Sequence, residues 1–211
     1  MVVSNPHEEN DMTGSTRTDR CEDCRSHVPD FDIIHLTLSD REQRRVCTRC
    51  CNTRIAARIG VAFDHPEFES MMLTDIAGTS HQFHFRTRLR GGHVAIEAFE
   101  IQNGSPGGYQ FQVLGEPEED LLLIFQRLFE RMRRALARCH IEQTELGPGI
   151  AKSGEEWVVR GRIEWDPEED GRVPRLVVDG TSYPWDEVGR MLMTFEGFQV
   201  KLEVYDRSEE R

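Results

Sequence analysis

The sequence has too few basic residues for an extended nucleic-acid-binding face. It contains 26 lysines and arginines against 38 aspartates and glutamates, a formal net charge of −12. Residues 1–60 carry 10 acids and 9 bases, whereas residues 61–211 carry 28 acids and 17 bases. Because nucleic-acid affinity comes largely from neutralising phosphates with a basic surface, this composition argues against a nucleic-acid partner. The partner that we expect is a protein.

Long apolar runs are also missing. No stretch approaches the ~18 residues of a membrane span. The first 20 residues lack the basic start and apolar stretch of a secretion signal, and their polar composition predicts a disordered tail over residues 1–20. Cysteines used as free thiols fit a reducing compartment. These absences predict a soluble cytoplasmic protein with no membrane partner.

Short motifs with a known catalytic chemistry are absent as well. The sequence contains no G-x-S-x-G, no Walker loop and no H-E-x-x-H. Cys139 beside His140 is not a catalytic dyad, because adjacent residues of a helix point about 100° apart. We expect Cys139 to lie in the core. No catalytic residue is assigned, and an enzyme with its site in a cleft of the C-terminal domain remains an alternative function.

Two cysteine pairs carry the strongest chemical signal in the chain. Cys21 and Cys24 form the first C-x-x-C pair, and Cys47 and Cys50 form the second after 22 intervening residues. Two such pairs predict a tetrahedral four-thiolate zinc site, whereas a redox pair would follow a strand in a βαβ pattern. Four thiolates leave no position for water, so the expected Zn²⁺ is structural, one per chain. Cys51 could replace Cys50, although the tight-turn spacing favours Cys50.

The residues around the cysteines predict the local fold of this module, residues 21–60. Phe31–Leu38 reads as a strand, Arg44–Val46 returns toward the second pair, and a helix follows that ends at Gly60. A knuckle, a hairpin and a second knuckle that opens a helix resemble the treble-clef class of zinc modules. That resemblance implies a fold and no activity.

The remaining residues, 61–211, predict one acidic α+β domain with a mostly antiparallel sheet, one long helix and one short helix. The expected strands are 71–76, 81–90, 93–102, 109–114, 157–165, 173–179 and 198–204, and the expected helices are 117–140 and 184–195. Because the domain has its own strands and helix, we expect it to fold without zinc. The opposing possibility is that Ile55 and Ile59 of the zinc module dock on it.

A two-residue turn at Gly91-Gly92 sets the pairing of the first hairpin. It pairs position 90 with 93, 86 with 97 and 84 with 99, and a break in alternation at Phe99 and Ile101 predicts a bulge or a twist that moves the strand end onto another surface. One outer face then carries five basic or imidazole side chains, for which we expect a solvated face or, alternatively, an anion-binding or partner-binding face: His84, Arg86, Arg88, Arg90 and His93. His81 points to the opposite face from His84, which argues against a shared metal ion.

The segment YPWDEVGRMLMTFEGFQVKLEV, together with the cysteine pairs, resembles a group of uncharacterised bacterial proteins. These are domains of unknown function with a zinc-binding front end, so the resemblance implies no activity. The function that we expect is a cytoplasmic interaction or adaptor protein containing structural zinc. A third hypothesis is a nucleic-acid-linked regulator that uses the arginines of the zinc module: Arg41, Arg44, Arg45, Arg49, Arg54 and Arg58.

Overall fold

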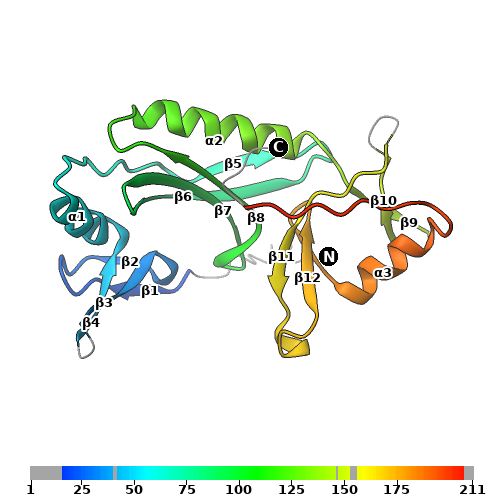
Figure 1. The fold of residues 1–211 in the computed structure, drawn as a ribbon, viewed down its shortest axis with the longest axis horizontal. Coiled ribbons are helices and arrows are strands. Elements are labelled where there is room, and N and C mark those ends of the chain that lie inside the picture. The colour runs from blue at the N-terminus through cyan, green and yellow to red at the C-terminus, as the bar shows by residue number, and fades with distance from the viewer. Residues whose placement is uncertain (1–15, 40–41, 146, 153–155, 207–211) are drawn as a thin grey trace, which may run out of the picture.

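A computed structural model describes residues 16–39, 42–145, 147–152 and 156–206 of the chain. The predicted tail over residues 1–20 lies mostly outside this part. The fold is α+β with antiparallel sheets, as the sequence predicts. Figure 1 shows three regions in chain order, with the N-terminal module on the left, a central sheet and a C-terminal region on the right. Among the described residues, no helix is long and apolar enough to cross a membrane.

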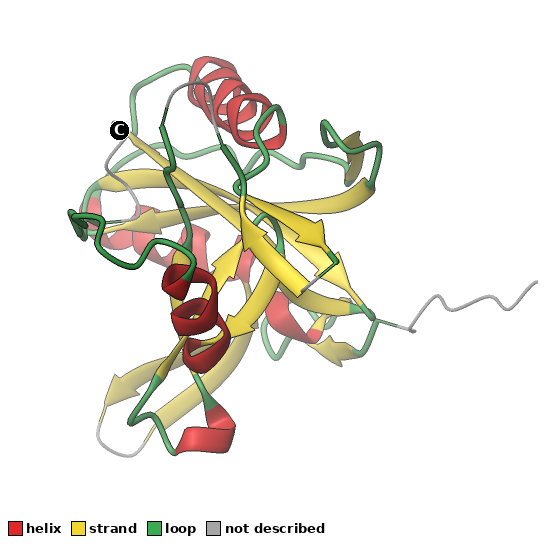
Figure 2. Ribbon diagram, turned by 90° about the vertical axis from the view of Figure 1, so that its right-hand side faces the viewer, coloured by secondary structure: helices red, strands yellow, loops and turns green. Residues whose placement is uncertain are grey.

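The central element is a four-stranded antiparallel sheet with strand order β5-β6-β7-β8. Its strands are β5 (Met71–Thr74), β6 (Ser80–Arg90), β7 (His93–Gln102) and β8 (Ser105–Gly115). Helix α2 (Leu121–Leu136) lies along one face of this sheet, at the top of Figures 1 and 2. The opposite side of the sheet faces the N-terminal module.

The register of the β6–β7 hairpin is the predicted one. Arg90 pairs with His93, Arg86 with Glu97, and the pairing continues regularly through the hairpin. Because residues that share a strand face alternate, this register sends the phenylalanines of β6 toward α2 and the arginines away from it. The predicted bulge is confirmed as a shift of the β7–β8 register between Phe99 and Glu100.

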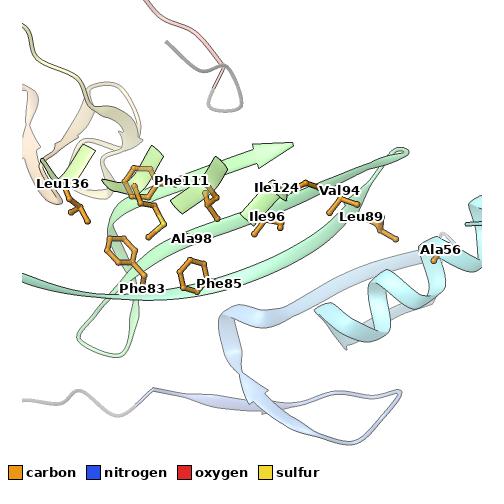
Figure 3. Packing of buried hydrophobic residues seen from close by; sticks show 12 residues of the cluster. Ala56, Phe83, Phe85, Leu89, Val94, Ile96, Ala98, Phe111, Ile124 and Leu136 are labelled. Carbon is orange, nitrogen blue, oxygen red and sulfur yellow. The ribbon is translucent and has the colours of Figure 1, made fainter. Parts of the chain in front are cut away.

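The main hydrophobic core lies between this sheet and α2. Ile124, Leu128 and Met132 of α2 are fully buried against apolar side chains of β6, β7 and β8. Figure 3 shows these strand residues on one sheet face, with Ala56 of the N-terminal module at one end of the same cluster. Three such fully buried side chains stabilise the fold by roughly 5–9 kcal/mol at ~1.5–3 kcal/mol each.

The N-terminal module consists of two short hairpins and one helix. Its elements are β1 (Thr18–Arg20), β2 (His27–Pro29), the 3₁₀ turn η1 (Asp30–Asp32), β3 (Ile33–Ser39), β4 (Glu42–Cys47) and α1 (Thr48–Ile59). The predicted end of the helix is confirmed, since Gly60 adopts a left-handed φ of 75° and donates to the Ala56 carbonyl.

Helix α1 docks on the part of β6 that β5 leaves unpaired. β5 pairs only with residues 80–83 of β6, so the following residues have an open edge on that side. The side-chain amide of Asn52 donates to the Thr87 carbonyl over 2.7 Å and accepts from the Leu89 amide over 3.0 Å. The Asn52 amide thereby replaces one rung of a neighbouring strand, and Asn52 itself is 1% exposed.

Apolar contacts accompany this polar one. Ala56 is 6% exposed and belongs to the main core, Ile55 packs against it, and Ile59 stays 42% exposed. The connector after the helix packs on the same core through Phe63 and Phe68, and the Phe68 ring stacks on Phe125 of α2 at 4.3 Å. The structure therefore favours docking of the N-terminal module on the central sheet, through Ile55 but not Ile59.

The C-terminal region has a smaller core of its own. It contains β9 (Ile141–Thr144), β10 (Gly147–Ile150), β11 (Arg162–Trp165), the turn η2 (Pro167–Glu169), β12 (Pro174–Val178), β13 (Thr181–Pro184) and α3 (Trp185–Met193). The strands form a β9–β10 hairpin and a sheet of order β11-β12-β13. Val178, Tyr183, Val188 and Met191 are buried together where α3 covers β12 and β13.

Several predicted boundaries are wrong. The long helix was expected over 117–140 but begins after Asp120, whose side chain accepts from the Leu122 amide and caps the helix. It ends at Leu136, so Cys139 lies beyond the helix and is exposed instead of buried in the core. The apolar spacing continued past the true end of the helix, which misplaced this cysteine.

Two predicted strands are also shorter than expected or missing. The strand expected over 157–165 forms only over Arg162–Trp165, and Trp157 lies outside it. The strand expected over 198–204 does not form, and the apolar side chains of that segment are 66–84% exposed. Alternation alone does not make a strand when no neighbouring strand supplies hydrogen bonds.

Replacing Asn52 with alanine tests the contact between α1 and β6. We expect the free energy of unfolding to fall by roughly 2–4 kcal/mol, because a buried donor and a buried acceptor lose their partner. Urea unfolding of Asn52→Ala beside Thr53→Ala measures this, since the Thr53 hydroxyl bonds only the carbonyl of Arg49 on the same, exposed part of the helix. Equal effects of the two substitutions would contradict the role assigned to Asn52.

Candidate metal centre

The four predicted zinc ligands lie together in the N-terminal module. The Sγ atoms of Cys21, Cys24, Cys47 and Cys50 all lie within 4.8 Å of one another. None of the six cysteines forms a disulfide. Sulfurs that share a tetrahedral Zn²⁺ at about 2.3 Å stand about 3.8 Å apart, and the Cys24 and Cys47 Sγ atoms are 3.8 Å apart. The arrangement therefore fits a four-coordinate metal ion.

Backbone hydrogen bonds shape the two knuckles. Arg25, just after the first pair, has a left-handed φ of 65° and donates its amide to the Cys21 carbonyl over 3.0 Å. The Cys47 amide donates to the Cys21 Sγ over 3.2 Å, which directs a positive dipole at that sulfur. Cys47 occupies the N-cap position of α1, and Cys50 lies in the first turn, where the partial positive charge of a helix N-terminus stabilises thiolates.

Burial differs among the four thiols. Cys21 is fully buried and Cys47 is 6% exposed, whereas Cys24 is exposed. Hydrogen bonds from Ser26 lower the pKa of Cys24 to about 6. Burial raises the pKa of Cys47 and, together with the neighbouring sulfurs, that of Cys50. Four adjacent thiolates repel one another, so their full deprotonation needs a cation among them.

Cys51 is separate from this cluster. It is 3% exposed, and burial raises the pKa of its thiol. It does not belong to the group of four sulfurs, and its side chain packs with Val46 in the small core of the module. The geometry therefore favours Cys50 over Cys51 as the fourth ligand.

The sequence predicts a solvated outer face for the β6–β7 hairpin. In the structure, η1 covers the middle of that face. The Phe31 ring meets the His84 ring edge-on at 5.3 Å, and the Asp32 Oδ2 atom lies 2.9 Å from the His84 Nε2 atom. Arg86 donates to the Phe31 carbonyl over 2.8 Å and to Glu97, which is 3% exposed. The sequence of the hairpin carries no signal for this cover, because the covering residues lie more than 50 positions away.

Arg88, Arg90 and His93, the other three residues of that face, lie toward the Gly91-Gly92 turn. Arg90 is about half exposed and donates to Glu97 over 3.2 Å, and the exposed His93 lies 3.4 Å from Glu116. Arg88 is partly buried, and this burial lowers the pKa of its guanidinium. The structure thus divides the five residues between an internal interface and a rim. Binding of an anion or a partner at that rim stays a prediction.

A buried histidine between two carboxylates lies at the far end of the central sheet. The Nδ1 atom of His81 is 2.9 Å from Glu100 Oε1, its Nε2 atom is 3.2 Å from Asp75 Oδ2, and its ring meets Tyr109 edge-on. Burial by itself would lower the pKa of His81, but the two carboxylates outweigh it and the pKa is raised. The sequence places His81 only on a strand face, and the predicted register puts Glu100 opposite Phe83, diagonal to His81 on the same face.

A surface hollow of about 350 Å³ lies where β8 meets α2. Its polar lining is engaged in the fold: Arg127 donates to Glu119 and to the Leu114 carbonyl, and Arg131 donates to the Gln112 carbonyl. The two arginines thereby cover carbonyls on the outer edge of β8. An enzyme site in a cleft stays an untested alternative.

Three family models match consecutive parts of the chain, and each is described as a domain of unknown function. DUF7685 matches residues 20–62, DUF7686 matches 64–137 and DUF7713 matches 140–209. No curated protein and no solved structure matches the chain. The resemblance to uncharacterised domains is confirmed to this extent, and a bacterial origin stays a prediction. Two of these models cover the residues that the sequence predicts as one domain, 61–211, and they meet between the end of α2 and the start of β9.

Metal analysis of single-cysteine variants tests the ligand set. We expect one metal ion per purified chain, loss of that ion in Cys50→Ser, and retention in Cys51→Ser, which is the matched control on the neighbouring residue. Plasma emission spectrometry after dialysis gives the ratio. Loss of metal from Cys51→Ser with retention in Cys50→Ser would reverse the assignment of the fourth ligand.

The pH dependence of stability tests the His81 cluster. Because the folded-state pKa of His81 is raised above its ordinary value of 6.5, its contribution is fully present below pH ~6.5 and is lost as the pH rises through the folded-state pKa. Urea unfolding from pH 6 to 9 should therefore show a decline in wild type that is smaller in His81→Gln. Parallel curves for the two proteins would show that His81 does not titrate as described.

Proposed function

We propose that residues 21–60 form a treble-clef-like module that holds one structural Zn²⁺ through Cys21, Cys24, Cys47 and Cys50. The observation that carries this proposal is the approach of the four sulfurs to within 4.8 Å of one another. A bound Zn²⁺ would offset half of the negative charge of the four thiolates and join the two knuckles. Because four protein ligands complete a tetrahedral shell, the ion has a structural role.

The zinc would support more than its own module. Cys47 occupies the N-cap position of α1, and α1 supplies Asn52 and Ala56 to the central sheet. On the outer face of that sheet, η1 supplies Phe31 and Asp32. Metal loading would therefore also affect the stability of the central sheet. The folding of zinc modules is typically coupled to an apparent free energy of metal binding of ~10–16 kcal/mol.

We further propose that the protein acts in the cytoplasm as an interaction protein rather than as an enzyme. Helix α3 supports this role, because its apolar surface is wider than the part that is buried. Val188 and Met191 face the second core, whereas Trp185, Leu192 and Met193 are 43%, 43% and 65% exposed. Trp185 and Leu192 are seven positions apart and share one face, so they form a stripe that suits helix-against-protein recognition.

A protein partner is favoured over nucleic acid by the contacts of four of the six arginines of the zinc module, of which Arg41 lies outside the described residues. Arg54 donates two hydrogen bonds to the Asp23 carboxylate, and Arg44 binds the same group. Arg45 pairs with Asp19, and Arg49 pairs with Glu67 over 3.0 Å. Phosphate groups would have to displace these carboxylates, which weakens the proposal of a nucleic-acid-linked regulator.

The interaction role is tested by affinity capture from cells that make the protein. We expect a protein retained by wild type to be lost by at least about tenfold with Leu192→Glu/Met193→Glu, because burying a charge without a partner is unfavourable. Arg190→Glu, an exposed change on the same helix, is the matched control. Equal retention by both variants, with folding checked by circular dichroism, would exclude this face of α3 as the binding surface.

A further inference from the structure

Strand β11 has an open edge and exposed apolar side chains. It is the outer strand of the β11-β12-β13 sheet and, in the described part of the chain, pairs with β12 alone. Ile163 and Trp165 are 58% and 65% exposed, although Ile163 shares a sheet face with Leu176 and with the buried Tyr183. Helix α3 covers β12 and β13, so the apolar face continues onto β11 without cover.

The segment 198–204 has the sequence pattern of a strand but pairs with no strand among the described residues. Its apolar residues alternate strictly with polar ones and are highly exposed: Phe198 at 66%, Val200 at 84%, Leu202 at 82% and Val204 at 72%. It belongs to no strand among the described residues. The chain runs back across the molecule here, drawn in red in Figure 1. The pattern is that of a strand with one apolar face, although no strand of the described residues pairs with it.

The charges of the two segments select one way of pairing them. Along β11, Arg162 and Glu164 lie on one face and bind each other. Along 198–204, Lys201 and Glu203 lie on one face and their Nζ and Oε1 atoms are 2.7 Å apart. Only an antiparallel register that sets Leu202 opposite Ile163 places both acids against both bases.

In that register one face of the paired strands has opposite charges facing each other, and the other face has apolar side chains facing each other. Glu203 is then opposite Arg162, Lys201 is opposite Glu164, and Val200 is opposite Trp165. Moving the pairing by two residues in either direction, or reversing the strand, sets at least one like-charged pair face to face. Opposite charges and apolar pairs across a ladder stabilise a sheet, whereas like charges directly opposite destabilise it.

Within one chain, residues 198–204 cannot pair with β11 in this register, because Phe198 is held near the wrong end of β11. The Phe198 ring packs edge-on against Trp157 at 6.0 Å and against Phe195 at 5.7 Å. Trp157 precedes β11, whereas the selected register requires Phe198 to lie opposite position 167, beyond the other end of β11. The open edge of β11 is therefore available to the segment of a second chain.

We propose that the protein forms a symmetric dimer in which residues 198–204 of each chain pair antiparallel with β11 of the other. Each contact then occurs twice, as a twofold axis requires. The pairing closes the open edge of β11 and covers Ile163 and Trp165 with Val200 and Leu202. This inference is independent of the binding role proposed for α3, because it uses a different edge and different residues.

Sedimentation velocity of the full-length, zinc-loaded protein over a concentration series tests the proposal. Wild type should form a concentration-dependent dimer. The exchange Lys201→Glu/Glu203→Lys keeps composition and the local ion pair but opposes like charges, so the dimer dissociation constant should rise roughly tenfold or more. Leu202→Pro should do the same, because proline removes a ladder donor at an exposed position.

A matched control is the exchange Glu130→Arg/Arg133→Glu on α2, where the two side chains form an exposed ion pair at 3.2 Å. It should leave the dimer unchanged. Adding Arg162→Glu/Glu164→Arg to the Lys201→Glu/Glu203→Lys protein should restore dimerisation, with thermal unfolding used to confirm that β11 remains folded. A protein that stays monomeric throughout the series, or a dimer that none of these changes affects, would overturn the proposal.

Discussion

The architecture depends on how the open edge of β6 is covered. β5 is too short to pair with the whole of β6, and an unpaired row of backbone groups in a buried place is costly. The chain resolves this with a side chain rather than a strand, because the Asn52 amide makes both hydrogen bonds that a neighbouring peptide group would make. A helix held by two cysteine knuckles thus completes a sheet that begins at Met71, twelve residues after the helix ends.

This contact joins two parts of the chain that match separate family models. Ala56, in the first matched segment, is buried in the core of the second, and Phe31 of the first lies edge-on at 5.5 Å against Phe99 of the second. Both layers around the central sheet are therefore needed: α2 on one face, and η1 with α1 at the other face and at the edge. The boundary between the two matched segments therefore does not separate two hydrophobic cores, because residues of both segments pack together.

The sequence predicts the features that local chemistry determines. The cysteine spacing locates the four sulfurs, because each C-x-x-C pair is joined by one tight turn. The Gly91-Gly92 turn fixes the β6–β7 pairing, and the loss of alternation at Phe99 indicates the bulge, because these effects act over a few residues. The end of α1 at Gly60 follows from the same kind of reasoning.

Features that depend on distant residues were not predictable in this way. The arginines of β6 alternate like solvent-facing residues, yet Phe31 and Asp32 cover some of them from more than 50 positions away. Helix α2 ends before its apolar spacing does, which moved Cys139 from the predicted core to the surface. Residues 198–204 alternate like a strand, but alternation does not say which neighbour would supply the hydrogen bonds.

The order of the segments along the chain has a consequence for synthesis. The four cysteines and α1 leave the ribosome before any strand of the central sheet, because α1 ends at Ile59, twelve positions before Met71, the first residue of β5. N-terminal parts generally fold first as they emerge. The nascent β6 therefore meets a helix that already presents Asn52, so its open edge is protected during the interval in which other unpaired edges would be free to aggregate.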